Sequence, residues 1–69
     1  MKYTLVGQDG NAFALMGYTS KALKREGLGD KVKGMMDEAT SGDYNNLIRV
    51  CMKYLDMANE KAGEEDDEE

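Results

Sequence analysis

Residues 43–60 read D-Y-N-N-L-I-R-V-C-M-K-Y-L-D-M-A-N-E, and this stretch decides the fold. Asp43 precedes the run and is a residue type that caps helix N-termini. Apolar residues then recur at spacings of three and four and predict a helix with one apolar stripe, made of Tyr44, Leu47, Ile48, Cys51, Leu55 and Ala58. Val50, Tyr54 and Met57 widen this stripe, so one neighbouring helix is not enough to cover it.

Two further helices are predicted before this stretch. The first covers about residues 12–26, because Asn11 is a suitable N-cap and Gly27 a suitable C-cap. The second is shorter, with Asp30 as its predicted N-cap and Gly42 at its end. The chain has no proline and no internal repeat, so a second domain is not indicated.

The first residues of the chain alternate in the way of a pleated strand. Residues 2–7 read K-Y-T-L-V-G and are rich in residue types that strands favour. No other segment has this pattern, yet the backbone groups of a strand need a partner. We therefore expect a mainly α fold, one N-terminal β-strand followed by three helices (βααα), with the strand paired across a homodimer. The alternative is that the segment lies extended over its own helices with its backbone solvated.

The predicted contact between two copies combines this strand with the widened stripe of the third helix. A chain of 69 residues buries only about 60% of its unfolded surface, so small domains gain stability from a disulfide, a metal or a partner. Cys51 is the only cysteine and histidine is absent, which excludes an internal disulfide and the usual zinc templates. Association with a second copy is the source of stability that remains. The residues predicted to make this contact are Tyr3, Thr4, Leu5, Val6, Val50, Tyr54 and Met57.

Acidic residues are concentrated at the C-terminus. The formal net charge is -5, but six of the fourteen acidic residues fall in residues 64–69. Runs of like charge without apolar residues stay disordered. We expect one small helical domain over residues 1–62 and a disordered acidic tail over residues 63–69. The sequence lacks a signal segment and a membrane span, and a lone thiol suits a reducing compartment, which together predict a cytoplasmic protein.

The sequence offers no catalytic constellation. Histidine, the usual general base near neutral pH, is absent. Cys51 falls on an apolar helix face, where burial makes a thiol unreactive. The carboxylate spacing of a calcium loop is absent as well. We therefore expect a protein that is not an enzyme and that holds no metal or other cofactor.

One loop has a weak signal for anion binding. Residues 7–12, G-Q-D-G-N-A, lie between the predicted strand and the first helix, where unpaired N–H groups and the helix dipole attract anions. Asp9 opposes an anion, so a turn with a helix cap is the simpler interpretation. Three bases on the first helix, without interleaved aromatic residues, do not favour nucleic-acid binding. The candidate ligand-binding residues are Gly7, Gln8, Gly10, Asn11, Lys21, Lys24 and Arg25.

Two motifs carry a resemblance to a class of known proteins. G-Q-D-G-N-A-F follows the predicted strand, and S-G-D-Y-N-N-L leads into the long helix. With these motifs the chain resembles the very small uncharacterised proteins that phages and prophages encode, over roughly residues 1–57. The motifs consist of turn and cap residues, so no active-site residue follows from them. The resemblance implies an accessory protein that acts on a bacterial host process, often by blocking a defence component.

Three functions remain open on this basis. The leading hypothesis is a non-enzymatic counter-defence factor, encoded by a phage, that neutralises a host immune component by binding it in the bacterial cytoplasm. The first alternative is an oligomer that sequesters a small anionic ligand, such as a nucleotide, between its subunits. The second alternative is a structural or accessory phage protein whose function is self-association.

Overall fold

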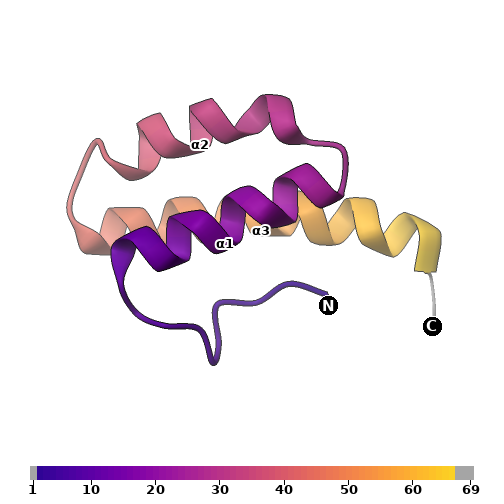
Figure 1. The fold of residues 1–69 in the computed structure, drawn as a ribbon, viewed down its shortest axis with the longest axis horizontal. Coiled ribbons are helices and arrows are strands. Elements are labelled where there is room, and N and C mark those ends of the chain that lie inside the picture. Colours follow the sequence, from indigo (N-terminus) through magenta and orange to yellow (C-terminus); the bar gives the residue numbers. More distant parts are fainter. Residues whose placement is uncertain (1, 67–69) are drawn as a thin grey trace.

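The computed structural model describes residues 2–66 and is built from three α-helices and one short 3₁₀ turn in that range. The elements are α1 (Ala12–Arg25), η1 (Gly29–Lys31), α2 (Val32–Ala39) and α3 (Tyr44–Asp66). Figure 1 shows the chain reversing between α1 and α2 and again between α2 and α3, while the N-terminal segment runs back along the helices. Both shorter helices pack on α3 and contact each other. The predicted mainly helical architecture is confirmed.

Polar side chains and one glycine set the ends of the longer helices, as predicted. The Asn11 side chain accepts hydrogen bonds from two N–H groups of the first turn of α1, at 2.8 and 3.2 Å. Gly27 ends this helix with a φ of 79°, and the Leu28 N–H returns to the Leu23 carbonyl at 2.7 Å. The Asp43 side chain accepts from an N–H group in the first turn of α3 at 2.9 Å. These local signals explain why the predicted bounds of α1 and the start of α3 agree with the structure.

The start of α2 differs from the prediction. Asp30 lies inside η1, and α2 begins at Val32 without a side-chain cap hydrogen bond. The Lys31 N–H donates to the Leu28 carbonyl at 2.9 Å and closes the 3₁₀ turn. Because the glycine cap of α1 directs Leu28 back onto that helix, few residues remain for reversing the chain, and a tight turn achieves it.

The core lies where α1 and α2 meet α3. Cys51 is completely buried there, as predicted, so its thiol is removed from solvent. Thr19 is a buried polar residue of the core, and its hydroxyl donates to the Leu15 carbonyl at 2.9 Å. The other fully or almost fully buried side chains come from all three helices and include Leu23, Met35, Ala39, Leu55 and Ala58.

The part of the chain that the structure describes contains no strand, so the strand predicted over residues 2–7 and its pairing across a homodimer are not confirmed. The Asn59 side chain from α3 takes the place of a neighbouring strand. Its Oδ1 accepts from the N–H groups of Lys2 and Tyr3 at 3.0 and 2.7 Å, and its Nδ2 donates to the Tyr3 carbonyl at 2.9 Å. The Thr4 N–H donates to the Tyr18 hydroxyl at 3.0 Å. These backbone groups are therefore satisfied within one chain.

Tyr3 anchors the segment in the core. Its side chain is only 5% exposed and meets the Tyr18 ring edge to face, with 6.4 Å between ring centroids. Beyond it, the Gln8 N–H donates to the Leu5 carbonyl at 3.1 Å, and Gly7 has a φ of 86°. This turn is a conformation that glycine adopts without strain, and it sends the chain towards α1.

The C-terminal end of α3 extends past the predicted boundary of the domain. The helix continues through Asp66, whereas the sequence predicts the domain to end at residue 62. Adding a residue to an existing helix is easier than starting one, and Glu is a good helix former, so the acidic composition does not end the helix at residue 63. Residues 67–69 of the predicted tail lie outside the described residues.

We expect Asn59→Ala to destabilise the fold and release the N-terminal segment. Three hydrogen bonds to the backbone are lost, and at about 1 kcal/mol each the free energy of unfolding should fall by about 2–3 kcal/mol. Urea unfolding measures this change, and faster amide exchange at residues 2–4 reports the release. Asn45→Ala, which truncates an exposed asparagine of the same helix, is the matched control. Equal stability of the two variants would contradict the role of Asn59.

Candidate binding surfaces

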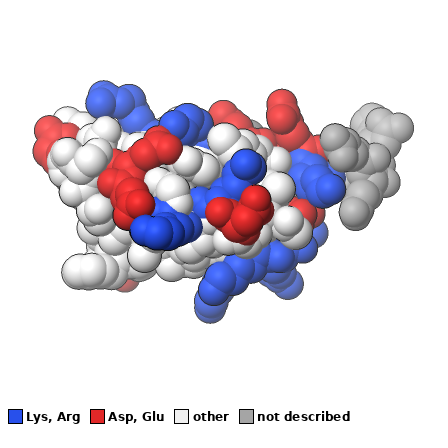
Figure 2. Space-filling view, turned by 90° about the horizontal axis from the view of Figure 1, so that it is seen from above, with Lys and Arg blue, Asp and Glu red and all other residues white. Residues whose placement is uncertain are grey.

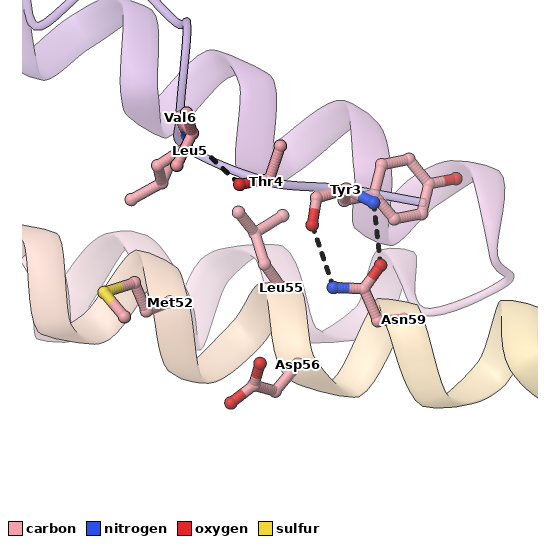
Figure 3. A pocket seen from close by; sticks show the side chains of 8 residues that line it. All are labelled: Tyr3, Thr4, Leu5, Val6, Met52, Leu55, Asp56 and Asn59. Carbon is pink, nitrogen blue, oxygen red and sulfur yellow. Dashed lines mark hydrogen bonds between the residues drawn. The ribbon is translucent and has the colours of Figure 1, made fainter. Parts of the chain in front are cut away.

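A groove runs between the N-terminal segment and the outer side of α3 (Figure 3). It has a volume of about 180 Å³. Figure 3 shows Leu55 pointing up from α3 towards the segment, Asn59 bonded to the backbone at one end, and Asp56 pointing away. The lining residues are Tyr3, Thr4, Leu5, Val6, Met52, Leu55, Asp56 and Asn59.

Apolar side chains stand on both sides of this groove. Val6 is 83% exposed on the N-terminal segment, and Met52 is 53% exposed on α3. Leu55 beneath them is buried. The Val6 N–H donates to the Thr4 hydroxyl at 3.1 Å, which fixes the backbone that carries the valine. The groove is therefore an apolar surface held in place by hydrogen bonds at its edge.

A polar cluster forms where the first residues of the N-terminal segment meet Glu26. The Tyr3 hydroxyl donates to the Glu26 carboxylate, and Lys2 Nζ lies 3.3 Å from the same oxygen. The hydrogen bond from Tyr3, with the charge of Lys2, holds the pKa of Glu26 below its ordinary value of 4.5, although burial acts in the opposite direction. Burial and the bond to Glu26 raise the pKa of Tyr3 above 10.0. The cluster attaches the segment to the C-terminal end of α1.

A second apolar surface, here called the end patch, lies where α1 begins and α2 turns into α3. Phe13 is 80% exposed and Tyr44 is 47% exposed, and the Tyr44 hydroxyl donates to the Gly10 carbonyl. They border a hollow of about 300 Å³. Its lining residues are Ala12, Phe13, Met16, Ala39, Thr40, Gly42, Asp43, Tyr44 and Leu47.

A third group of side chains, around Glu38, joins α2 to α3. Lys53 Nζ and the Tyr54 hydroxyl lie 2.5 and 2.6 Å from the two oxygens of the Glu38 carboxylate. The hydrogen bond from Lys53 is the first cause of a lowered pKa for Glu38, and that from Tyr54 is the second. The Asn46 side chain donates to the Glu38 carbonyl at 2.9 Å. All these groups have partners within the chain, so we assign the cluster to stability.

The structure does not bring the predicted anion-binding residues together within one chain. Residues 7–11 precede α1, whereas Lys21, Lys24 and Arg25 lie in its second half. Ten residues of helix separate Asn11 from Lys21, which corresponds to about 15 Å. The Asn11 side chain already occupies the first N–H groups of α1, and the Asp9 side chain accepts from the Asn11 N–H at 3.0 Å.

Three of the residues predicted for self-association are buried in the single chain. Tyr3, Val50 and Tyr54 belong to the core and do not face solvent. Leu5 and Met57 are half-buried against the core. Val6 is the member that remains well exposed. The wide apolar stripe of α3 is thus covered largely by α1, α2 and the N-terminal segment.

Sequence reasoning named Val6 as a contact residue but missed the exposed Phe13 and Met52. Phe13 and Met52 each lie off the buried stripe of their helix. Single apolar residues are common on protein surfaces, so this mismatch alone does not identify a contact site from the sequence. No comparable signal identifies Asn59, whose partners are more than fifty residues away.

Comparisons with known proteins return no match. No protein-family model, curated protein or solved structure is significantly similar to this chain. In the described part of the chain, no helix has the length and apolar character needed to cross a membrane. Residues 2–66 also contain no group of three or more side chains arranged to hold a metal ion.

We expect Glu26→Gln to weaken the dependence of stability on acid pH. A carboxyl group whose pKa is lowered in the fold stabilises the folded state above its unfolded pKa, and this contribution disappears as the pH falls through the folded pKa. The pKa of Glu26 is lowered from 4.5, so the wild type should lose more free energy of unfolding on acidification than the variant does.

Urea unfolding at neutral pH and again well below pH 4.5 measures this difference. Glu60→Gln, at an exposed position of α3, provides the control and should behave like the wild type. If Glu26→Gln loses as much stability in acid as the wild type, then Glu26 does not contribute to the acid sensitivity.

Proposed function

We propose that this protein is a non-enzymatic binding protein whose end patch docks onto a protein of the host cell. The observation that carries the proposal is the exposed Phe13 ring, 80% accessible, beside Tyr44 and an apolar hollow. An aromatic side chain held next to a hollow is the arrangement of an interface anchor, because it offers a large apolar area at a small cost in conformational entropy.

The charges around the end patch select the chemistry of the partner. Asp43 lines the hollow, and Asp9 lies in the loop whose Gly10 carbonyl is bonded to Tyr44. The lining residues include no Lys or Arg. Charge complementarity therefore favours a partner segment that presents an apolar side chain flanked by Lys or Arg.

The biological context of this proposal comes from the resemblance to very small phage proteins. In that context the protein is a counter-defence factor, and its partner is a component of bacterial immunity that it blocks in the cytoplasm. The protein then acts by occupying a surface of the partner, without a chemical step. A structural or accessory phage role is the simpler alternative, and it needs no foreign partner.

Sequestration of a small anionic ligand is a second candidate, and one observation favours it. Lys21, Lys24 and Arg25 are exposed, and none is in an ion pair within the described residues. Figure 2 shows Lys and Arg side chains projecting together from one edge of the molecule. An exposed Phe13 ring can also stack on a nucleobase. Since the loop and the basic residues are far apart in one chain, such a ligand lies between subunits.

We expect Phe13→Ser to abolish docking without unfolding the protein, because the ring is exposed. Two synthetic peptides serve as probes, each with a central Leu, one flanked by Lys and Arg and the other by Asp and Glu. The basic peptide should bind the wild type more tightly, and Phe13→Ser should weaken it by about tenfold or more. Met36→Ser, which changes an exposed methionine of α2 outside the end patch, is the matched control.

The same variants test the biological role. Expression of the wild type in bacteria that carry defence systems should restore growth of a phage that one of those systems blocks. The Phe13→Ser variant should not restore it, whereas the Met36→Ser variant should. Restoration by Phe13→Ser would show that the end patch is not the docking surface.

For the second candidate, we expect a nucleotide that binds only the native protein to raise its melting temperature. The protein is heated with and without a panel of mononucleotides and dinucleotides, and the combined change of Lys21→Glu and Lys24→Glu should remove any shift. Lys33→Glu, at an exposed position of α2, is the control. No shift with any nucleotide would exclude sequestration of that class of ligand.

A further inference from the structure

The solvent-facing side of α3 carries a short stripe of exposed residues beside the groove. Arg49, Met52 and Asp56 follow one another at spacings of three and four, so they share one face of the helix. Figure 3 shows Asp56 directed away from the N-terminal segment and Met52 at the open end of the groove. The stripe is continuous with the exposed Val6 across the groove. It forms a surface separate from the end patch.

The two charges of this stripe have no ion-pair partner among the side chains that the structure describes. The ion pairs among the described residues are Lys2 with Glu26, Lys33 with Asp37, and Lys53 with Glu38. Arg49 and Asp56 take part in none of them, and they lie about 10 Å apart along the helix axis. Their charges are opposite, and they stand at nearly equal distances before and after Met52.

We infer that this face of α3 binds a second copy of the chain, with the two α3 helices antiparallel about a two-fold axis next to Met52. In that arrangement Arg49 of each subunit faces Asp56 of the partner subunit. The pair occurs twice, once on each side of the axis, because a two-fold contact uses the same surface on both copies. The Met52 side chains meet at the axis, next to the Val6 side chains, and their exposed apolar area is covered.

The charge pattern selects a second copy with antiparallel helices. A surface with one cation and one anion placed symmetrically about an apolar centre is complementary to itself after a two-fold rotation. Parallel helices would instead set Arg49 against Arg49. Antiparallel helices place the C-terminal ends of α3 at opposite ends of the dimer. Lys2 to Thr4 need no change, because their hydrogen bonds to α3 and Tyr18 stay within each subunit.

The inference is independent of the end patch and differs from pairing of N-terminal strands. In strand pairing, the backbone of residues 2–7 makes the contact. Here the contact is made by side chains of α3, and the N-terminal segment contributes only Val6. The end patch stays open on both subunits, so a dimer of this kind can present two docking surfaces.

Charge reversal tests the geometry with exposed residues only. Arg49→Asp gives a chain that sets its new carboxylate against Asp56 of the partner subunit, and Asp56→Arg gives a chain that sets two arginines together. Each variant alone should dimerise about tenfold or more weakly than the wild type, as measured by sedimentation of the full chain at tens of micromolar. Mixed in equal amounts, the two variants should form a heterodimer, because both of its contacts then pair opposite charges.

The double variant, with both changes in one chain, should recover self-association. Lys24→Asp, an exposed change on α1, should leave it unaltered, and melting curves confirm that every variant is folded. High salt should weaken the wild-type dimer. The inference is wrong if the wild type is a monomer. It is also wrong if both single variants dimerise as tightly as the wild type, or if the two variants do not associate when they are mixed. Each of these results leaves the proposed docking by Phe13 intact, so the two proposals fail separately.

Discussion

The amide of Asn59 is the group on which the arrangement of the first residues depends. One side chain on α3 accepts two backbone hydrogen bonds and donates a third, and so it meets the needs of an extended segment that has no neighbouring strand. With the backbone held there, Tyr3 is buried and its hydroxyl reaches Glu26. The groove beside Leu55 exists because the segment is fixed at this distance from the helix.

Around that contact, α3 acts as the support for every other element. It packs against α1 and α2, and it holds the N-terminal segment on a further side. The broad apolar arc around Val50 and Tyr54 is therefore covered within one chain. The large apolar side chains that stay exposed among the described residues are Val6 and Met52 beside the groove, Phe13 and Tyr44 in the end patch, and Met36 on α2. The helices and the N-terminal segment cover the rest of the small core, so the groove and the end patch are the main exposed apolar surfaces of the described residues.

The sequence predicts the helices well because their ends are determined locally. Asn11, Gly27 and Asp43 act within a turn of their own position, and the structure confirms all three. Period-two alternation over residues 2–7 was less informative, since it indicates an extended chain and does not say what bonds to it. Here the hydrogen-bond partner is the side chain of Asn59, far along the sequence, and no pattern of residue spacing predicts that contact. The same limit applies to the surfaces: Phe13 and Met52 are recognisable as exceptions to a stripe only when the stripe's buried side is known.

The bond between Tyr3 and Asn59 also affects how the protein folds while it is being made. It joins the third residue of the chain to a residue within the last helix, so nearly the whole sequence forms the loop that it closes. Tyr3 leaves the ribosome before its binding site on α3 has been synthesised, with a delay of several seconds at ordinary rates of translation. During that interval α1 and α2 can form their own turns, while the aromatic side chain that completes the core stays in solvent. Completion of this core is thereby tied to the synthesis of α3.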